Sequence, residues 1–351
     1  MNRNQLIQYF KAVDKNTESW QSPDGSRVLV LPYGGRVLGL FAPGDDENFL
    51  WTHAALTHIE SARSFYQGEQ WHNSGGDRTW LAPEVDFFFP NFPKLDKYFQ
   101  QRALDPGHYE ASSSSGTLTL TNRANLKLSR GQHEVQLEIE KSVSPALNPL
   151  RYDTSAEAEG LKYAGNALRT TLQIRGKSGD DTTRIGLWNL LQMPHGGDLL
   201  VPTTARSQPK IYMGTIGPED LIVGEHLIVY KMRATGEHKL GVRATAITGR
   251  AGYIYGSGNQ TSLIVRNFGV NPSGEYVDVP LAELDNFGFA FQACNVNSQL
   301  GAFSELEYHV PAIASGSGEA RCEDVSQVWA FRGPEAAIKT IARLMLSSEV
   351  A

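Results

Sequence analysis

The chain has 351 residues, of which 40% are hydrophobic and 20% are charged, so it can bury a large core. Its net charge of −6 and pI near 5.9 argue against a nucleic-acid-binding protein, which would carry a basic surface and a higher pI. The two cysteines, Cys294 and Cys322, make no disulfide framework and fit a reducing compartment. No apolar run has the length of a signal peptide or a membrane span, so the sequence predicts a cytoplasmic protein with no membrane partner.

The N-terminal segment has the apolar spacing of a helix. A short helix is expected over residues 4–13, with Asn4 as its N-cap. Its apolar residues are Leu6, Ile7, Phe10 and Val13. A second helix is expected over about residues 334–346, where Pro334 suits a first helical position. Helical pattern is nearly absent between these two segments.

Between the helices, short apolar runs and period-two alternation predict strands. In 117–121 and 135–140 one face is apolar and the other polar, as in an antiparallel sheet with one wet side. The expected strands are 28–31, 36–41, 117–121, 126–128, 135–140, 168–175, 183–192, 227–231, 242–247, 253–255, 262–267, 287–293, 305–310 and 327–331; residues 112–115 are expected to form a turn. This succession predicts an all-β chain with one large sandwich of antiparallel sheets over about residues 27–331, in a single domain covering residues 1–351.

The stretch Trp71–Glu84, WHNSGGDRTWLAPE, concentrates side chains that sugar sites use. Its two indoles offer apolar faces for a sugar ring, while its guanidinium and carboxylates can pair with hydroxyls around a glycine turn. The candidate substrate-binding residues are Asn73, Asp77, Arg78, Trp80 and Glu84, with His72 as a candidate for catalysis. A structural alternative is a tight turn between strands, with Trp71 and Trp80 in the core and Asp77 paired with Arg78 at the surface.

A mid-chain strand also carries aromatic and polar side chains of the kind found in sugar sites. The segment 187–197 is a strand that runs into a turn. Trp188, Gln192 and His195 are placed to project from its end, and we take Trp188 and Gln192 as candidate substrate contacts.

A late strand carries two glutamates and a histidine. Alternation along 304–310 places Glu305, Glu307 and His309 on one face. Two glutamates on one face are commonly a solvated surface with Lys or Arg opposite. If the face instead points into a pocket, a carboxylate of raised pKa would be a general base and the neighbouring imidazole a general acid.

Patterns for cofactors and metals are weak. The glycine-rich residues 256–260 lack the strand-to-helix setting of a dinucleotide site. Among the nine histidines only His53 and His58 are close neighbours, with no His-Glu-x-x-His pattern and no paired cysteines. The sequence therefore predicts no cofactor and no metal, although ligands distant in sequence could still form a metal site. No Gly-x-Ser-x-Gly elbow supports a serine nucleophile.

Taken in chain order, these motifs resemble the galactose mutarotase-like superfamily, which includes the aldose 1-epimerases. The resemblance begins at Gly34-Gly35-Arg36 and continues through an Asn-rich turn to Gly75-Gly76. It then takes in Trp188-Asn189 and the late strand Leu306–His309, and it spans about residues 27–331. The chain resembles a divergent branch of this superfamily, because GGDRTWLAPE stands where the epimerases have His-Gly-Gly.

The resemblance implies a β-supersandwich with a sugar site on the concave face of its larger sheet. In the epimerases a glutamate takes the proton of the anomeric hydroxyl and a histidine protonates the ring oxygen. By position this implies Glu307 as the base, with Glu305 as the fallback, and His72 or His195 as the acid. Arg78 and Glu84 have no strict counterparts in the epimerases. Both are expected either to contact an acidic or unusual sugar or to form a buried pair that holds the loop.

Three functions remain open. The first is an aldose 1-epimerase or mutarotase that acts on a free sugar by general acid/base catalysis. The second is a carbohydrate-binding or regulatory module without turnover, and the third is a polysaccharide lyase or glycoside-cleaving enzyme. In each case the expected partner is a mono- or oligosaccharide, bound by a monomer or a homodimer, and His309 is expected among the substrate contacts.

Overall fold

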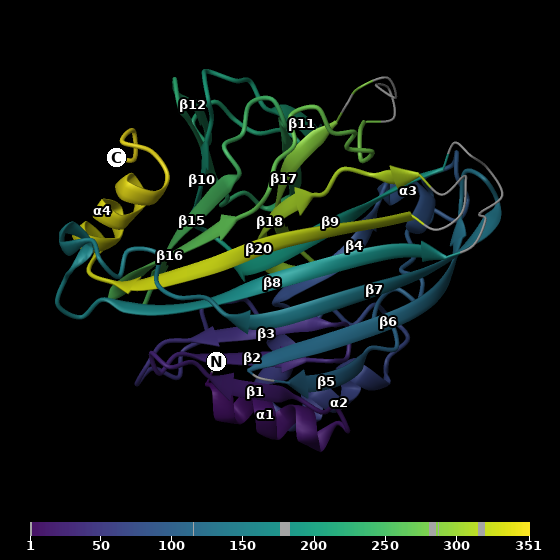
Figure 1. Cartoon of the computed structure of the whole chain (residues 1–351), viewed down its shortest axis with the longest axis horizontal. Helices are drawn as coiled ribbons and strands as arrows, with labels where there is room; N and C mark the ends of the chain where they lie inside the picture. Colours follow the sequence, from purple (N-terminus) through teal and green to yellow (C-terminus); the bar gives the residue numbers. More distant parts are fainter. Residues whose placement is uncertain (1, 115, 176–182, 281–285, 287, 315–319) are drawn as a thin grey trace.

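Two antiparallel sheets face one another in the computed structural model (Figure 1). The structure describes residues 2–114, 116–175, 183–280, 286, 288–314 and 320–351. The expected all-β sandwich, with short helices near both ends of the chain, is confirmed. No helix in these described ranges is long and apolar enough to cross a membrane.

The first sheet contains the segments that carry most of the candidate site residues. Its strands are β1 (Glu18–Gln21), β2 (Arg27–Leu31), β3 (Arg36–Phe41), β4 (Asp77–Ala82), β9 (Arg184–Pro194), β11 (Lys210–Met213), β14 (Gly236–Arg243), β17 (Phe289–Ser298), β18 (Gly301–His309) and β19 (Ile313–Ala314). They are ordered β1-β2-β3-β4-β9-β18-β17-β14-β11, and β19 pairs with β9. Strands that are distant in sequence therefore lie side by side at the centre of this sheet.

The second sheet lies in front of the first in Figure 1. Its strands are β5 (Glu110–Ser114), β6 (Thr117–Leu128), β7 (His133–Pro145), β8 (Lys162–Arg175), β10 (Asp198–Pro202), β12 (Leu221–Val223), β13 (Leu227–Lys231), β15 (Arg250–Ser257), β16 (Gln260–Asn267) and β20 (Ala320–Gly333). They are ordered β12-β13-β10-β15-β16-β20-β8-β7-β6-β5. In β6 every second residue is buried, because one face of the strand packs on the core and the other faces solvent.

The central strands of the first sheet are buried on both faces. All six residues of β4 are buried, and so are the residues of β9 from Ile185 to Met193. One face packs against the second sheet, and the other face, which we call the outer face, points away from it. Chain segments cover part of the outer face, so polar residues there are enclosed rather than solvated.

The helices lie around the edges and outer sides of the sandwich. They are α1 (Arg3–Ala12), α2 (Ile59–Gln67), α3 (Glu84–Phe87) and α4 (Glu335–Met345), with 3-10 turns at Ala54–Thr57 and Thr154–Ala156. α1 places Leu6 and Phe10 against Leu29 and Leu38 of the first sheet. α4 packs on the second sheet, away from α1 (Figure 1).

Several local predictions are wrong in detail. The N-cap of α1 is Asn2 rather than Asn4, and its side chain accepts a hydrogen bond from the Asn4 backbone amide. Pro334 is the N-cap of α4 rather than its first residue. α2 was not expected because only Ala62 and Phe65 are buried along it, too few to give a clear apolar stripe.

Several expected strands also differ in their bounds; for example, the strands expected at 117–121 and 126–128 are one strand, β6. The strand expected at 242–247 ends at Arg243, where the backbone turns and Ala246 donates a hydrogen bond to the Arg243 carbonyl. Residues 110–114 form β5 at the sheet edge, although part of this segment was expected to be a turn. The strand expected at 287–293 is β17, which extends to Ser298; residue 287 lies outside the described residues.

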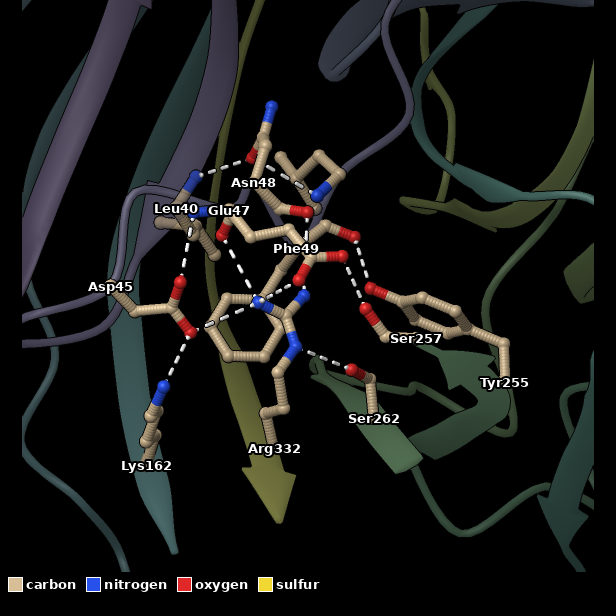
Figure 2. A network of polar contacts seen from close by, with 11 residues as sticks. Leu40, Asp45, Glu47, Asn48, Phe49, Lys162, Tyr255, Ser257, Ser262 and Arg332 are labelled. Carbon is tan, nitrogen blue, oxygen red and sulfur yellow. Dashed lines mark hydrogen bonds and ion pairs between the residues drawn. The ribbon is translucent and has the colours of Figure 1, made fainter. Parts of the chain in front are cut away.

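A buried polar network ties the loop 45–49 to the second sheet (Figure 2). Arg332 of β20 is 1% exposed, and its guanidinium donates to Asp45, Ser262 and the carbonyl oxygens of Glu47 and Asn48. Every nitrogen of this guanidinium has an acceptor, so the network is a satisfied structural tie.

Candidate functional site

Asp77 and Arg78 belong to opposite faces of the first sheet, because neighbouring side chains of a strand alternate. Asp77 points to the second sheet, where its Oδ2 lies 2.6 Å from Arg266 Nη1. Arg78 lies on the outer face, and its Nη1 is 2.8 Å from Glu305 Oε1. All four side chains are buried. The alternative of a surface pair between Asp77 and Arg78 is therefore wrong, and Asp77 is a core ion-pair residue.

Strand register gathers polar residues on the outer face of β4, β9, β18, β17 and β14, because directly paired residues point to the same side of a sheet. One row across the strands contains Gln192, Glu305, Cys294 and Lys239. Neighbouring rows pair Glu307 with Gln292, and Trp188 with both His309 and Trp80. The outer-face cluster consists of Arg78, Trp80, Trp188, Gln192, Lys239, Gln292, Cys294, Glu305, Glu307 and His309.

Glu307 lies at the centre of the outer-face cluster and is 1% exposed. Its Oε2 lies 3.1 Å from Lys239 Nζ and accepts a 3.0 Å hydrogen bond from Trp188 Nε1. The Lys239 ammonium also lies 4.5 Å from the centre of the Trp188 ring. Burial raises the pKa of Glu307 to about 7, with Lys239 opposing the shift and Glu305 adding to it. A carboxylate with such a pKa can exchange protons at neutral pH.

Several buried polar atoms of the outer-face cluster have no partner. His309 stacks on Trp188 with ring centres 5.4 Å apart, and neither of its ring nitrogens is hydrogen-bonded. Burial lowers the pKa of His309 to about 4, so its ring is neutral at pH 7. Both amide atoms of Gln192 and the Oε1 of Gln292 are also unpartnered, although these side chains are 0% exposed. Each such group costs about 1–3 kcal/mol, so their concentration here points to a ligand position.

The segment after β4 folds over the outer-face cluster. Glu84 donates its backbone amide to Asp278 Oδ1 at 2.8 Å, and Gln292 Nε2 lies 3.0 Å from Asp278 Oδ2. Tyr98 donates its hydroxyl to Glu84 Oε1 at 2.9 Å, and its ring stacks on Phe88. Burial raises the pKa of Glu84. Burial also acts on Asp278, but Lys239, His309 and hydrogen bonds from Glu84 and Gln292 hold its pKa below the usual value.

A residue that sequence reasoning missed, Asp105, positions the two indoles of the Trp71–Glu84 stretch. Its Oδ2 accepts hydrogen bonds from Trp71 Nε1 and Trp80 Nε1, both at 2.9 Å, and from Arg36 Nη2 at 3.0 Å. Arg36 also donates to Asn73, so Asn73 belongs to this buried support rather than to the outer-face cluster. No local pattern in the sequence marks Asp105, because its partners come from two other segments, β3 and the Trp71–Glu84 stretch.

The structure does not bring His72 to the outer-face cluster. Its Nδ1 lies 2.6 Å from the Tyr33 hydroxyl, and its Nε2 lies 3.0 Å from the Gly68 carbonyl. Its ring packs among Tyr33, Phe65 and Tyr66.

His195 is also directed elsewhere. Its Nε2 lies 3.0 Å from Asn295 Oδ1. Asn295 follows Cys294 on β17 and pairs with Ser304, so its side chain points to the opposite face from Glu307. The imidazole beside Glu307 is therefore that of His309.

One group of side chains in the described part of the chain has the composition of a metal site. Ligand atoms of Cys294, Glu305 and Glu307 lie within 4.8 Å of one another. Arg78 and Lys239 already pair with the two carboxylates, and burial raises the pKa of the Cys294 thiol well above its usual value. The two side-chain cations thus supply the positive charge that a metal would otherwise bring.

A pocket of about 270 Å³ lies apart from these residues. It is lined by Asp14, Lys15, Asn16, Pro32, Tyr33, Gly107, His108 and Tyr109. None of the candidate site residues lines it.

Comparisons with known proteins found solved structures that are similar to this chain. Similar solved structures include the galactose mutarotase related enzyme from Lactobacillus acidophilus, with 9% identity and a TM-score of 0.46 over 90% of this chain and 97% of that one. They also include the GalM/aldose epimerase homologue from C. elegans, with 8% identity and a TM-score of 0.43 over 90% and 98% of the two chains. Galactose 1-epimerase from Lactobacillus acidophilus NCFM has 9% identity and a TM-score of 0.38 over 90% and 98%.

These structures bear the names of the group that the sequence motifs resemble, and at this similarity they carry no information about the reaction. A search of curated proteins found no match. The family described as "Family of unknown function (DUF6786)" matches residues 4–351, and the chain belongs to this family.

Proposed function

We propose that the outer-face cluster binds a sugar and that the chain is an aldose 1-epimerase-like enzyme, which opens and recloses the sugar ring by general acid/base catalysis. The observation that carries this proposal is Glu307, a buried carboxylate whose pKa is raised to about 7. It lies beside unpartnered polar groups of His309 and Gln192. The Trp188 indole beside them gives an apolar surface for a sugar ring.

Glu307 would act as the general base. Its Oε2 is held by Lys239 and Trp188, whereas its Oε1 has no hydrogen bond to any described residue. Oε1 is therefore available to take the proton of the anomeric hydroxyl. His309 is neutral, so it would donate one ring N–H and accept with the other nitrogen, and Gln192 would hold a further hydroxyl.

Lys239 would supply the proton that the ring oxygen needs. Burial lowers the pKa of its ammonium, but the negative charges of Glu307, Glu84 and Asp278 together outweigh this and raise it, with the charge of Glu307 having the largest effect of the three. When Glu307 takes the anomeric proton, that charge disappears, so Lys239 becomes a stronger acid at that step. The anomeric C–O bond to the ring then breaks, a carbonyl forms, and the ring oxygen takes the Lys239 proton. Ring closure reverses these transfers, so no other reactant is needed.

Anomer-exchange NMR of the purified protein tests this function. The panel should contain neutral, amino, uronic and phosphorylated sugars, with line broadening read for binding and anomer interconversion read for turnover. We expect catalysed exchange of at least one sugar, which Glu307→Gln abolishes while binding remains. Binding without exchange would instead support a non-catalytic carbohydrate-binding module, and a Glu307→Gln variant with full activity would rule out Glu307 as the base.

A further inference from the structure

The outer-face cluster and the segments that cover it hold more acidic than basic side chains. Among the described residues of this site, the cations are Arg78 and Lys239, and the carboxylates are Glu84, Asp278, Glu305 and Glu307. Arg78 pairs with Glu305 at 2.8 Å and Lys239 pairs with Glu307 at 3.1 Å. Glu84 and Asp278 are left without an ion pair of their own.

Neutral donors hold these two remaining carboxylates. Glu84 accepts from the Tyr98 hydroxyl, and Asp278 accepts from the Glu84 backbone amide and from Gln292. Both carboxylates raise the pKa of Lys239, and Glu84 also raises the pKa of Glu307, so these charges lie close enough to influence one another. Two negative charges are thus uncompensated by side-chain cations.

A second observation at the same place points to a ligand. His309 and Gln192 are at most 1% exposed and have no hydrogen-bond partner for any side-chain polar atom. Such groups are rare in the interior of folded proteins unless a ligand or water satisfies them. Burial also raises the pKa values of Glu84 and Glu307, so protons compensate part of the surplus negative charge in the unliganded protein.

We infer that this site prefers a sugar that carries a positively charged amino group to a neutral sugar, and that it disfavours a uronic acid. The inference rests on the proposed function, because it specifies the sugar that the same site takes. An ammonium can pair with Glu84 or Asp278 without displacing Arg78 or Lys239. A carboxylate on the sugar would instead approach surplus negative charge, since both cations are already paired.

Glucosamine, glucose and glucuronic acid, titrated separately and followed by NMR, test the preference. We expect glucosamine, at a pH where its amine is charged, to bind roughly ten-fold more tightly than glucose, because one partly desolvated ion pair is worth at least that much. Glucuronic acid should bind most weakly. Added salt should reduce the advantage of glucosamine, because it screens the attraction.

Glu84→Gln removes one surplus charge and keeps an amide oxygen for the Tyr98 hydroxyl. This variant should lower the ratio of glucosamine affinity to glucose affinity, and that ratio is the readout. Glu335→Gln is the matched control, because Glu335 is 67% exposed on α4, which packs on the other sheet. It should keep the wild-type preference, and loss of the preference in both variants would overturn the role of Glu84.

The outcomes separate this inference from the proposed function. Equal binding of glucosamine and glucose would overturn the charge preference and leave a sugar site standing, whereas no binding of any of the three sugars would overturn both. Zn²⁺ alone is a further probe. Zn²⁺ binding that Cys294→Ser abolishes and Cys322→Ser retains would assign the surplus charge to a metal ion and overturn the inference.

Discussion

Glu307 is the central residue of the site for two reasons. Its carboxyl group is buried, and its Oε1 makes no hydrogen bond to a described residue. A solvated glutamate would be ionised at neutral pH and would be a weak base. Loss of hydration raises the pKa of Glu307 to about 7, while Lys239 limits the shift by favouring the charged form. The pKa of Glu307 therefore depends on the balance between burial, which raises it, and the charge of Lys239, which lowers it.

The pH dependence of turnover follows from this balance. The base must be ionised to accept a proton, so kcat/KM should rise as the pH rises through about 7 and then level off. Anomer-exchange NMR across the pH range measures the profile. An unfolding curve at each pH is the control for stability, and a flat profile through neutrality would exclude Glu307 as the titrating base.

At the scale of the element, β4 places charged side chains on both of its buried faces. Its alternation sends Asp77 to Arg266 between the sheets and Arg78 to Glu305 on the outer face. Because both faces are covered, each charge needs its own partner. The stability of the strand therefore depends on pairs made with β16 and β18, which are far away in sequence.

Removing one partner of the core pair should be costly. Arg266→Met would leave Asp77 buried and unpaired, and we expect it to lower the free energy of unfolding by about 3–5 kcal/mol. The double variant Asp77→Leu/Arg266→Met should recover most of this loss, because it leaves no isolated charge. Chemical denaturation measures all three proteins, and a single variant as stable as the wild type would contradict a structural role for the pair.

The turn before β4 requires glycine. Gly75 has φ of +98°, and a Cβ there would lie 2.3 Å from the Trp51 carbonyl oxygen. Gly75→Ala should therefore destabilise the protein by roughly 2 kcal/mol or more. Gly44→Ala is the matched control, since φ is +67° but no atom lies within 4 Å of the added Cβ. Thermal unfolding compares them, and equal losses would show that backbone conformation alone, not the close approach, sets the cost.

At the scale of the whole molecule, polar ties as well as apolar packing connect the sheets and their loops. Arg332 of β20 ties the loop 45–49 to the second sheet (Figure 2), and the Tyr255 hydroxyl donates to the Phe49 carbonyl in the same network. This network is fully hydrogen-bonded, whereas the outer-face cluster is not.

Loss of the Arg332 tie should free the loop from the sheet. We expect Arg332→Met to lower the free energy of unfolding by roughly 3 kcal/mol, because it leaves the Glu47 and Asn48 carbonyl oxygens without their donor and removes one of the two cations of Asp45, which keeps Lys162. Hydrogen exchange should then speed up at the Phe49 amide, which bonds to the Leu40 carbonyl. Lys339→Met on α4, at an exposed ion pair, is the control and should change neither quantity much. Unchanged exchange at Phe49 in Arg332→Met would contradict the tie.

The sequence by itself determined the fold class and one face of the site. Period-two alternation is a local property of the chain, so it predicted the antiparallel strands and placed Glu305, Glu307 and His309 on one side of β18. α2 was missed because few buried residues mark it, and the N-cap of α1 was misplaced because Asn2 and Asn4 are both suitable cap residues.

Only the tertiary structure decided which strands are neighbours and which faces are covered. It brought Arg78 to Glu305, 227 positions away in the chain, and Lys239 to Glu307. It also directed His72 and His195 to other partners. The pKa of Glu307 depends on burial beneath segments from elsewhere in the chain. Pairing and desolvation of this kind join distant parts of the chain, so no local pattern in the sequence encodes them.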